Sequence, residues 1–210
     1  MSSTRDLEGE VALVVGGSRN QGAAFAENIA SRGATTVISY ANGVEAAEQT
    51  VALPRKPGVA AEAIQSDARV SGQVNELFEG VVRRYGKLDI TPGAVIKKPL
   101  ADFTDADFDH LIDLNTRSAF NTLRATARNI ADNGRYVVLS TTLTSIMTGP
   151  YGLYSGSKAA VERMVLAAAK ELGARGITVD DSFYRAGCTY SGTSGPRQAC
   201  PPGITSSPES

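Results

Sequence analysis

Tyr154 and Lys158 lie four positions apart, a spacing that places both side chains on one face of a helix. A free tyrosine phenol has a pKa of about 10. A lysine charge nearby favours the phenolate, so we expect the pKa of Tyr154 to fall toward a range useful for acid–base chemistry. The spacing alone is weak evidence. It gains weight because the pair opens the Ala-rich helical pattern that follows the fifth strand pattern, so we predict that this pair transfers a proton.

A second candidate site is the turn Gly16–Gly22, which follows the apolar run Val11–Val15 and precedes a helical pattern. Glycines in such a turn let the backbone approach a pyrophosphate, and the helix N-terminus offers free N–H groups and a positive dipole end. A plain tight turn is the alternative. We expect a dinucleotide site whose residues include Gly16, Ser18, Arg19, Asn20, Gln21 and Gly22.

The type of dinucleotide follows from the end of the second strand pattern, Thr35–Ser39. The next residues, Tyr40 to Asn42, contain no acid that would bind a ribose 2′-OH. Arg19 in the glycine turn is placed to meet a 2′-phosphate. Both features favour NADP(H), with Tyr40 included in the site. The alternative is that Arg19 is an ordinary solvated loop residue.

These residues need a scaffold, and the apolar pattern supplies one. Short β-rich runs alternate with helical periodicity; the runs are 11–15, 35–39, 63–66, 88–90, 136–139 and 177–179, and the helical patterns include 74–82, 108–123 and 157–172. Six strands alternating with helices predict an α/β fold, a Rossmann-like doubly wound parallel sheet. We expect one domain over residues 1–181, followed by a disordered, low-complexity tail over residues 182–210, which are rich in Gly, Ser, Thr and Pro.

Composition narrows the functional class. The 210 residues are 42% hydrophobic and 20% charged, with a net charge of −1, so no basic balance suggests nucleic acid. No apolar run approaches the roughly 20 residues of a membrane span, and the polar N-terminus does not resemble a signal peptide. Cys188 and Cys200 lack metal-type spacing, so we expect no metal site. The cytoplasm is the expected location.

Together these motifs resemble the short-chain dehydrogenase/reductase family, over roughly residues 5–179. The glycine turn is similar to the family's T-G-x3-G-x-G motif: Gly16 and Gly22 match its first and last glycines. Val15 stands for the Thr and Asn20 for the middle Gly, and Asn tolerates a left-handed backbone better than most residues. Tyr154-x3-Lys158 matches the family's catalytic pair, and the resemblance implies an enzyme of the NADP(H) type.

The resemblance also implies roles. The family's Tyr protonates the carbonyl oxygen during reduction, and its Lys also binds the nicotinamide ribose, which assigns these roles to Tyr154 and Lys158. A family serine stands thirteen residues before the Tyr, where this chain has Thr141. The hydroxyls of Ser140 and Thr142 flank it, and we favour Thr141, with Ser140 next.

Two further positions match the family. Asn115 corresponds to an Asn that holds a proton-relay water; the alternative is a satisfied core Asn. Asp67, after the third strand pattern, corresponds to an adenine-contacting Asp; a lone Asp there is otherwise most often a helix cap.

The chain departs from the family in two places. Leu88–Ile90 meets Thr91–Ala94 where the family has Asn-Asn-Ala-Gly, so the fourth strand is expected to be short. After Val179 the family's Pro-Gly turn, substrate loop and seventh strand are not recognisable. The sixth strand is therefore expected to be an exposed sheet edge.

We expect an NADPH-dependent oxidoreductase that reduces a ketone or other carbonyl, or oxidises the alcohol, in secondary metabolism. The helical patterns around 116–128 and 157–172 favour a homodimer or homotetramer, because they match the family's usual interfaces. The competing hypothesis is an inactive relic of the family that binds the cofactor or a partner protein. The short fourth strand and the unmatched C-terminal part favour that alternative.

Overall fold

Three parallel strands form the first sheet of the computed structural model, which describes residues 7–52, 60–85, 99–146, 149–185 and 188–192. They are β1 (Val11–Val15), β2 (Thr35–Tyr40) and β3 (Ala61–Gln65), paired in the order β1-β2-β3. Val11 is opposite Thr35, and Thr36 is opposite Ala61. β1 and β2 are runs of mostly β-branched and apolar residues, which favour buried parallel strands.

Alternation along these strands determines which helices cover each face. Leu13, Val15 and Val37 pack against α3 (Ser71–Tyr85), whose Val74, Leu77, Phe78 and Val81 form its buried face. Val14 and Ile38 point the other way, toward Ala26 of α1 (Asn20–Ser31) and Ala47 of α2 (Val44–Ala52). The sheet is therefore buried on both faces. The helical pattern expected at 74–82 is confirmed, whereas α2 was not anticipated.

The second sheet contains β4 (Arg135–Thr141), β5 (Thr178–Arg185) and β6 (Cys188–Gly192). β4 and β5 are parallel, and β6 pairs antiparallel with β5. β5 continues past residue 181 to Arg185, and the chain is strand-paired as far as Gly192. The expected division into a domain and a tail after residue 181 stays a prediction. The predicted free edge of the sixth strand is instead hydrogen-bonded to β6, which satisfies its backbone groups.

The helical segments of the C-terminal half are α4 (Asp105–Leu111), a π-helical segment (Ile112–Arg117), α5 (Ser118–Asn129) and α6 (Gly152–Leu172). Of these, α5 and α6 cover one face of the second sheet, and α4 and the π-helical segment pack against α6. Short 3-10 turns occupy Leu100–Asp102, Thr142–Thr144, Gly149–Tyr151 and Gly173–Arg175. The core beneath the helices joins Leu123 and Val161 to Tyr136 and Val179. α4 begins at a capping box in which the Thr104 hydroxyl accepts from the backbone N–H of Asp107.

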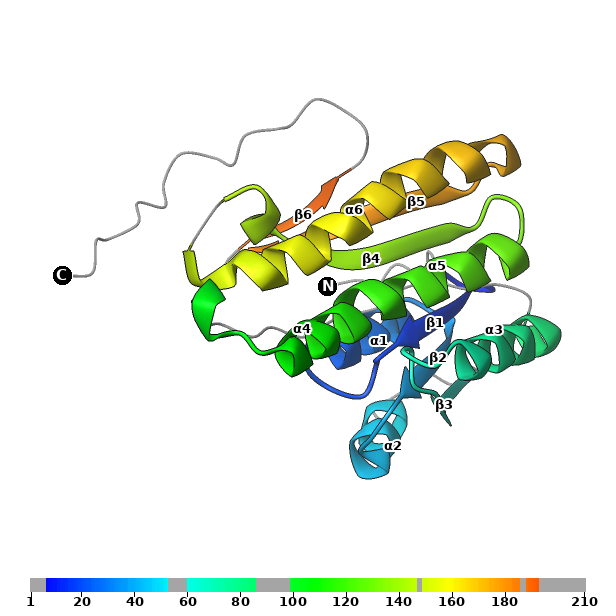
Figure 1. The fold of residues 1–210 in the computed structure, drawn as a ribbon. Helices are drawn as coiled ribbons and strands as arrows, with labels where there is room; N and C mark the ends of the chain where they lie inside the picture. The colour runs from blue at the N-terminus through cyan, green and yellow to red at the C-terminus, as the bar shows by residue number, and fades with distance from the viewer. Residues whose placement is uncertain (1–6, 53–59, 86–98, 147–148, 186–187, 193–210) are drawn as a thin grey trace.

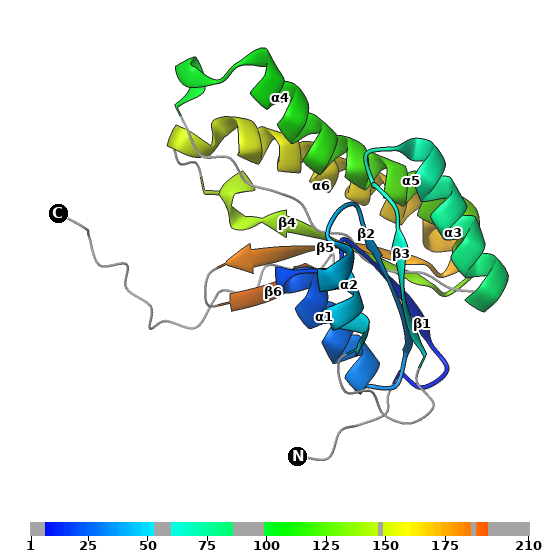
Figure 2. The same cartoon turned by 90° about the horizontal axis from the view of Figure 1, so that it is seen from below.

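The layers follow the predicted doubly wound pattern. α3, α5 and α6 lie on one side of the strands, and α1 and α2 lie on the other (Figure 2). The carboxyl ends of β1 and β4 point toward the same side of the molecule (Figure 1). The predicted strand 88–90 lies outside the described residues. The strands of the described residues form two three-stranded sheets, the second of which includes the antiparallel β6, where six parallel strands were expected. Among the described residues, no helix has the length and apolar character needed to span a membrane.

Candidate active site

Tyr154 and Lys158 lie in the first two turns of α6, which starts at Gly152 and so includes the Tyr in the helix. Both side chains are buried, with exposed fractions of 6% and 4%. Nζ of Lys158 donates a hydrogen bond of 2.8 Å to the carbonyl oxygen of Leu139 on β4. The predicted pair is therefore assembled at the carboxyl end of β4, although its lysine contacts the strand backbone.

The electrostatics of this pair differ from the sequence-based expectation. Burial raises the pKa of the Tyr154 phenol, and a hydrogen bond with the Thr141 side chain opposes that rise. Burial also lowers the pKa of Lys158 to about 8, against the charge of Glu162, which raises it. The expected depression of the Tyr154 pKa by a lysine charge is wrong for this structure, because desolvation of the phenolate dominates. Tyr154 is thus a protonated acid at neutral pH.

Thr141 is the hydroxyl that faces Tyr154. It ends β4, is buried, and its Oγ1 accepts from the backbone N–H of Leu143 at 3.3 Å. Ser140 points to the other side of the strand, where its Oγ donates to Oε1 of Glu162 at 2.6 Å. Because side chains alternate along a strand, the two neighbouring hydroxyls have different partners on α6: Thr141 bonds Tyr154, and Ser140 bonds Glu162. The geometry supports Thr141 over Ser140.

Asn115 lies in the π-helical segment and is 2% exposed. Its Nδ2 donates to Oγ of Ser157 at 3.1 Å, and Ser157 Oγ in turn donates to the carbonyl oxygen of Tyr154 at 2.7 Å. The extra residue of a π-helical turn is often found at functional sites. Asn115 is therefore joined to the helix that carries the Tyr–Lys pair.

The glycine turn has the conformation that the sequence analysis required. Gly16 and Asn20 both have positive φ values, 76° and 51°, so Asn20 does adopt the left-handed backbone. Gly22 is buried against the turn: a Cβ there would overlap the carbonyl oxygen of Gly16 and lie 3.1 Å from Cα of Gly17. Only glycine fits at Gly22, and the close approach holds the turn against the start of α1.

The N-terminus of α1 carries neither a side-chain cap from its N-cap residue, Arg19, nor an acid in its first turn that would repel an anion. Ser18 and Gln21 flank this end and are half-buried, and the Ser18 carbonyl accepts from Oγ1 of Thr50 at 3.3 Å. The first-turn N–H groups and the dipole therefore fit the pyrophosphate of a dinucleotide.

Arg19 reaches the end of β2. A Cβ built at Gly43 would overlap its guanidinium group and lie 3.1 Å from Cζ, so the guanidinium rests directly on the Gly43 backbone. Tyr40 ends β2 half-buried and packs against the core formed by Val14, Ala26, Ile38 and Ala47. Arg19 therefore lies against the loop that follows β2, and its role toward a 2′-phosphate stays a prediction, whereas Tyr40 is engaged partly in packing.

Asp67 follows β3 and is held by Arg69. Its Oδ1 accepts from the backbone N–H of Arg69 at 2.9 Å, and its Oδ2 pairs with the guanidinium at 2.5 Å. The hydrogen bond from Arg69 is the main cause that lowers the pKa of Asp67. Asn121 of α5 donates to the carbonyls of Ala68 and Arg69 at 3.0 and 3.3 Å, which ties this loop to α5.

Three residues at the site were not predicted from the sequence: Ser157, Glu162 and Gly43. Ser157 is three residues after Tyr154 and Glu162 is four after Lys158, so helical spacing was the available clue. Gly43 carried no clue, because its role depends on where Arg19 lies.

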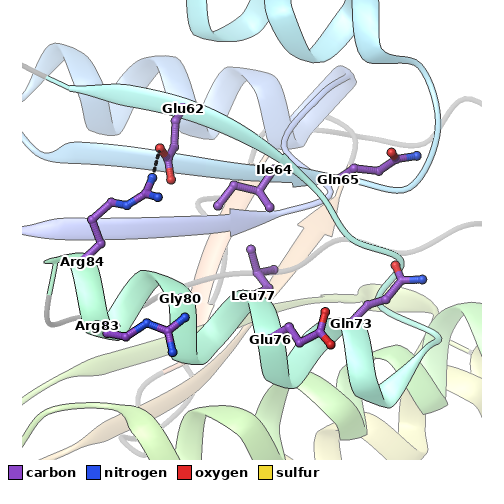
Figure 3. A pocket seen from close by; sticks show the side chains of 9 residues that line it. All are labelled: Glu62, Ile64, Gln65, Gln73, Glu76, Leu77, Gly80, Arg83 and Arg84. Carbon is purple, nitrogen blue, oxygen red and sulfur yellow. Dashed lines mark hydrogen bonds and ion pairs between the residues drawn. The ribbon is translucent and has the colours of Figure 1, made fainter.

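A cavity of about 520 Å³ lies elsewhere, between β3 and α3 (Figure 3); it is lined by Glu62, Ile64, Gln65, Gln73, Glu76, Leu77, Gly80, Arg83 and Arg84, and by none of the predicted site residues.

Comparison with known proteins matches this geometry to a family. A strand–glycine turn–helix unit followed by a buried Tyr–Lys pair on a later helix defines a dinucleotide-dependent oxidoreductase of Rossmann type. Residues 16–181 match the family model described as enoyl-(acyl carrier protein) reductase. The chain is 37% identical to elsinochrome reductase 1 of Elsinoe fawcettii over 85% of this chain and 68% of the relative. It belongs to the short-chain dehydrogenase/reductase family.

Other relatives agree. A hydroxynaphthalene reductase of Aspergillus fumigatus is 36% identical over 83% of this chain and 65% of the relative, so the chain spans about two thirds of the length of these curated relatives. A solved short-chain dehydrogenase from Burkholderia cenocepacia, in complex with NADP, is 35% identical with a TM-score of 0.77, over 83% of this chain and 73% of the other.

Proposed function

We propose that the protein is an NADPH-dependent reductase of a ketone, acting on an aromatic, polyketide-type metabolite. The observation that carries the proposal is the hydrogen bond between the Tyr154 and Thr141 side chains, one helical turn from the buried Lys158. The substrate class is supported by the relatives named elsinochrome reductase and hydroxynaphthalene reductase. NADP(H) is supported by the solved relative in complex with NADP and by the place of Arg19 beside Gly43.

Different residues of the site would bind different parts of the cofactor. Gly22 and the N-terminus of α1 fit the pyrophosphate, and Arg19 fits a 2′-phosphate. NADPH supplies a hydride when it is bound. Lys158, now on the Leu139 carbonyl, is within the helix turn that would hold the nicotinamide ribose.

Tyr154 is the proton donor. Because burial raises its pKa, the phenol keeps its proton at neutral pH and is available to a carbonyl oxygen that gains negative charge. The Thr141 hydroxyl donates a second hydrogen bond to that oxygen and orients it. Asn115, bonded to Ser157, positions the start of α6 and is the proposed end of a water relay.

The test measures NADPH binding by fluorescence titration, then NADPH consumption with a hydroxylated bicyclic aromatic ketone, for the unchanged protein and for Tyr154→Phe. We expect Tyr154→Phe to bind NADPH with unchanged affinity and to lose turnover by at least about 100-fold, the usual contribution of a general acid. Tyr85→Phe, the same chemical change on α3, is the matched control. NADPH binding with no Tyr154-dependent turnover would overturn the reductase and favour the inactive relic.

A further inference from the structure

One face of α6 carries a row of three side chains at four-residue spacing: Tyr154, Lys158 and Glu162. Consecutive residues of β4 hold the last two. Leu139 accepts from Nζ of Lys158 at 2.8 Å, and Oγ of Ser140 donates to Oε1 of Glu162 at 2.6 Å. The lysine and the glutamate are therefore fixed next to each other against the same strand.

The burial of Lys158 makes its charged form energetically unfavourable. Only 4% of the residue is exposed, and its hydrogen-bond partner is a neutral carbonyl. An ammonium ion without a counter-charge is costly in such a place, and the neutral amine is the usual outcome. Glu162 supplies a negative charge that acts on Lys158 and opposes the effect of burial.

The described partners of this row are Thr141, Ser157 and Asp181, which are neutral or carboxylic. Thr141 faces Tyr154 from β4, and Ser157 stands between Tyr154 and Lys158 on α6. On β5, Asp181 is close enough to Glu162 for their charges to interact, and burial followed by the Glu162 charge raises the pKa of Asp181. The Glu162 carboxylate, on the same helix as Lys158, is thus the negative charge that favours the protonated form of Lys158.

We propose that Glu162, held by Ser140, is a positioning residue that keeps the buried Lys158 in its charged form beside Tyr154. The idea rests on the proposed function for its purpose: an ammonium group one helical turn from Tyr154 offsets part of the cost of the phenolate left after proton transfer, while burial dominates the pKa of Tyr154. Glu162 touches neither substrate nor cofactor in this scheme and acts only through Lys158.

The direct test is the titration of Lys158 in the full chain, followed by NMR of the lysine side-chain Cε and Hε signals. Lys158→Arg assigns the Lys158 signal by its loss. In the unchanged protein we expect a midpoint near pH 8. Glu162→Gln keeps a group that bonds Ser140 and removes the charge, so the midpoint should fall by about one pH unit.

Further variants complete the design. Glu162→Asp restores the charge and should return the midpoint toward that of the unchanged protein. Glu171→Gln removes an exposed charge from the end of the same helix and should leave the midpoint where it was. If Glu162→Gln fails to fold, Glu162→Ala removes the same charge without a buried amide. An unchanged Lys158 midpoint in a folded, neutral Glu162 variant would overturn the proposal.

Activity gives a second, separate readout. A fall of the Lys158 midpoint toward pH 7 should weaken turnover in Glu162→Gln more at pH 8 than at pH 6, whereas a structural defect would lower it equally at both. The NMR titration requires neither NADPH nor a ketone. It therefore tests the effect of Glu162 on Lys158 even if the reductase assay shows no turnover. A normal reductase with an unmoved Lys158 midpoint would refute only the role of Glu162.

Discussion

Asn115 and Ser157 lie 42 positions apart in the sequence and are joined by a hydrogen bond of 3.1 Å between Nδ2 and Oγ. The two residues are 2% and 1% exposed, so the bond is made in the interior. It connects the π-helical segment before α5 to the turn of α6 that carries Tyr154. A buried amide that loses a partner pays its full desolvation penalty, so this bond is sensitive to mutation.

Ser157→Ala is therefore expected to lower the free energy of unfolding by about 1–3 kcal/mol, because it leaves Nδ2 of Asn115 without this acceptor. Urea denaturation followed by circular dichroism measures the change. Ser31→Ala, which removes an exposed hydroxyl bonded to the Asn28 carbonyl, is the control and should change little. Equal effects of the two substitutions would contradict the prediction.

Gly22→Ala is expected to disrupt the glycine turn, because the added Cβ would overlap the Gly16 carbonyl oxygen and crowd Gly17. Overpacking of this kind costs about 1–3 kcal/mol of stability. NADPH affinity, measured by fluorescence titration, should fall with it. At Gly72, in α3, a Cβ meets no atom within 4 Å, so Gly72→Ala should keep NADPH affinity and lose no stability. A Gly22→Ala protein that binds NADPH normally would show that the turn is not the cofactor cradle.

Arg19→Ala is expected to weaken NADPH binding and to leave NADH binding nearly unchanged. The guanidinium rests on Gly43 at the end of β2, and a charge-assisted hydrogen bond contributes about 1.5–3 kcal/mol, roughly 10- to 150-fold in affinity. Titrations of both nucleotides give the ratio. Arg163→Ala, on the exposed side of α6, is the matched control. An equal loss of affinity for NADPH and NADH would mean that Arg19 supports the glycine turn and does not bind the 2′-phosphate.

Lys158 makes stability depend on pH in the alkaline range. Its pKa in the folded protein is about 8, below the ordinary value of 10.5 that applies when the chain unfolds. Between these values the unfolded chain holds more protons, so the Lys158 contribution to the unfolding free energy rises with pH. At pH 7 both states are charged, and burial of that charge opposes folding in full.

Lys158→Met should consequently be more stable than the unchanged protein at pH 7, by up to about 3 kcal/mol at 1.36 kcal/mol per pKa unit. The difference should shrink as the pH rises from 8 toward 10.5. Urea denaturation of both proteins across this range provides the measurement. Lys170→Met, at an exposed position on α6, should show no such trend. A difference that stays constant with pH would mean that Lys158 is not desolvated.

The sequence determined the local parts of this site. A strand, a glycine turn and a helix follow from residue types in one continuous stretch, and so does the left-handed backbone of Asn20. Helical spacing by itself placed Tyr154 and Lys158 on one face of α6. These features were predictable because each depends on neighbours within one or two turns.

Tertiary structure decided what those residues do. Only the packing of α6 on β4 separates Thr141, which faces Tyr154, from Ser140, which binds Glu162. The pKa of Tyr154 was expected to fall and instead rises, because burial depends on residues far apart in the sequence. The pairing of β6 with β5, which covers the expected free edge, is likewise non-local. Desolvation and contact across elements are set by the fold as a whole, and no spacing pattern encodes them.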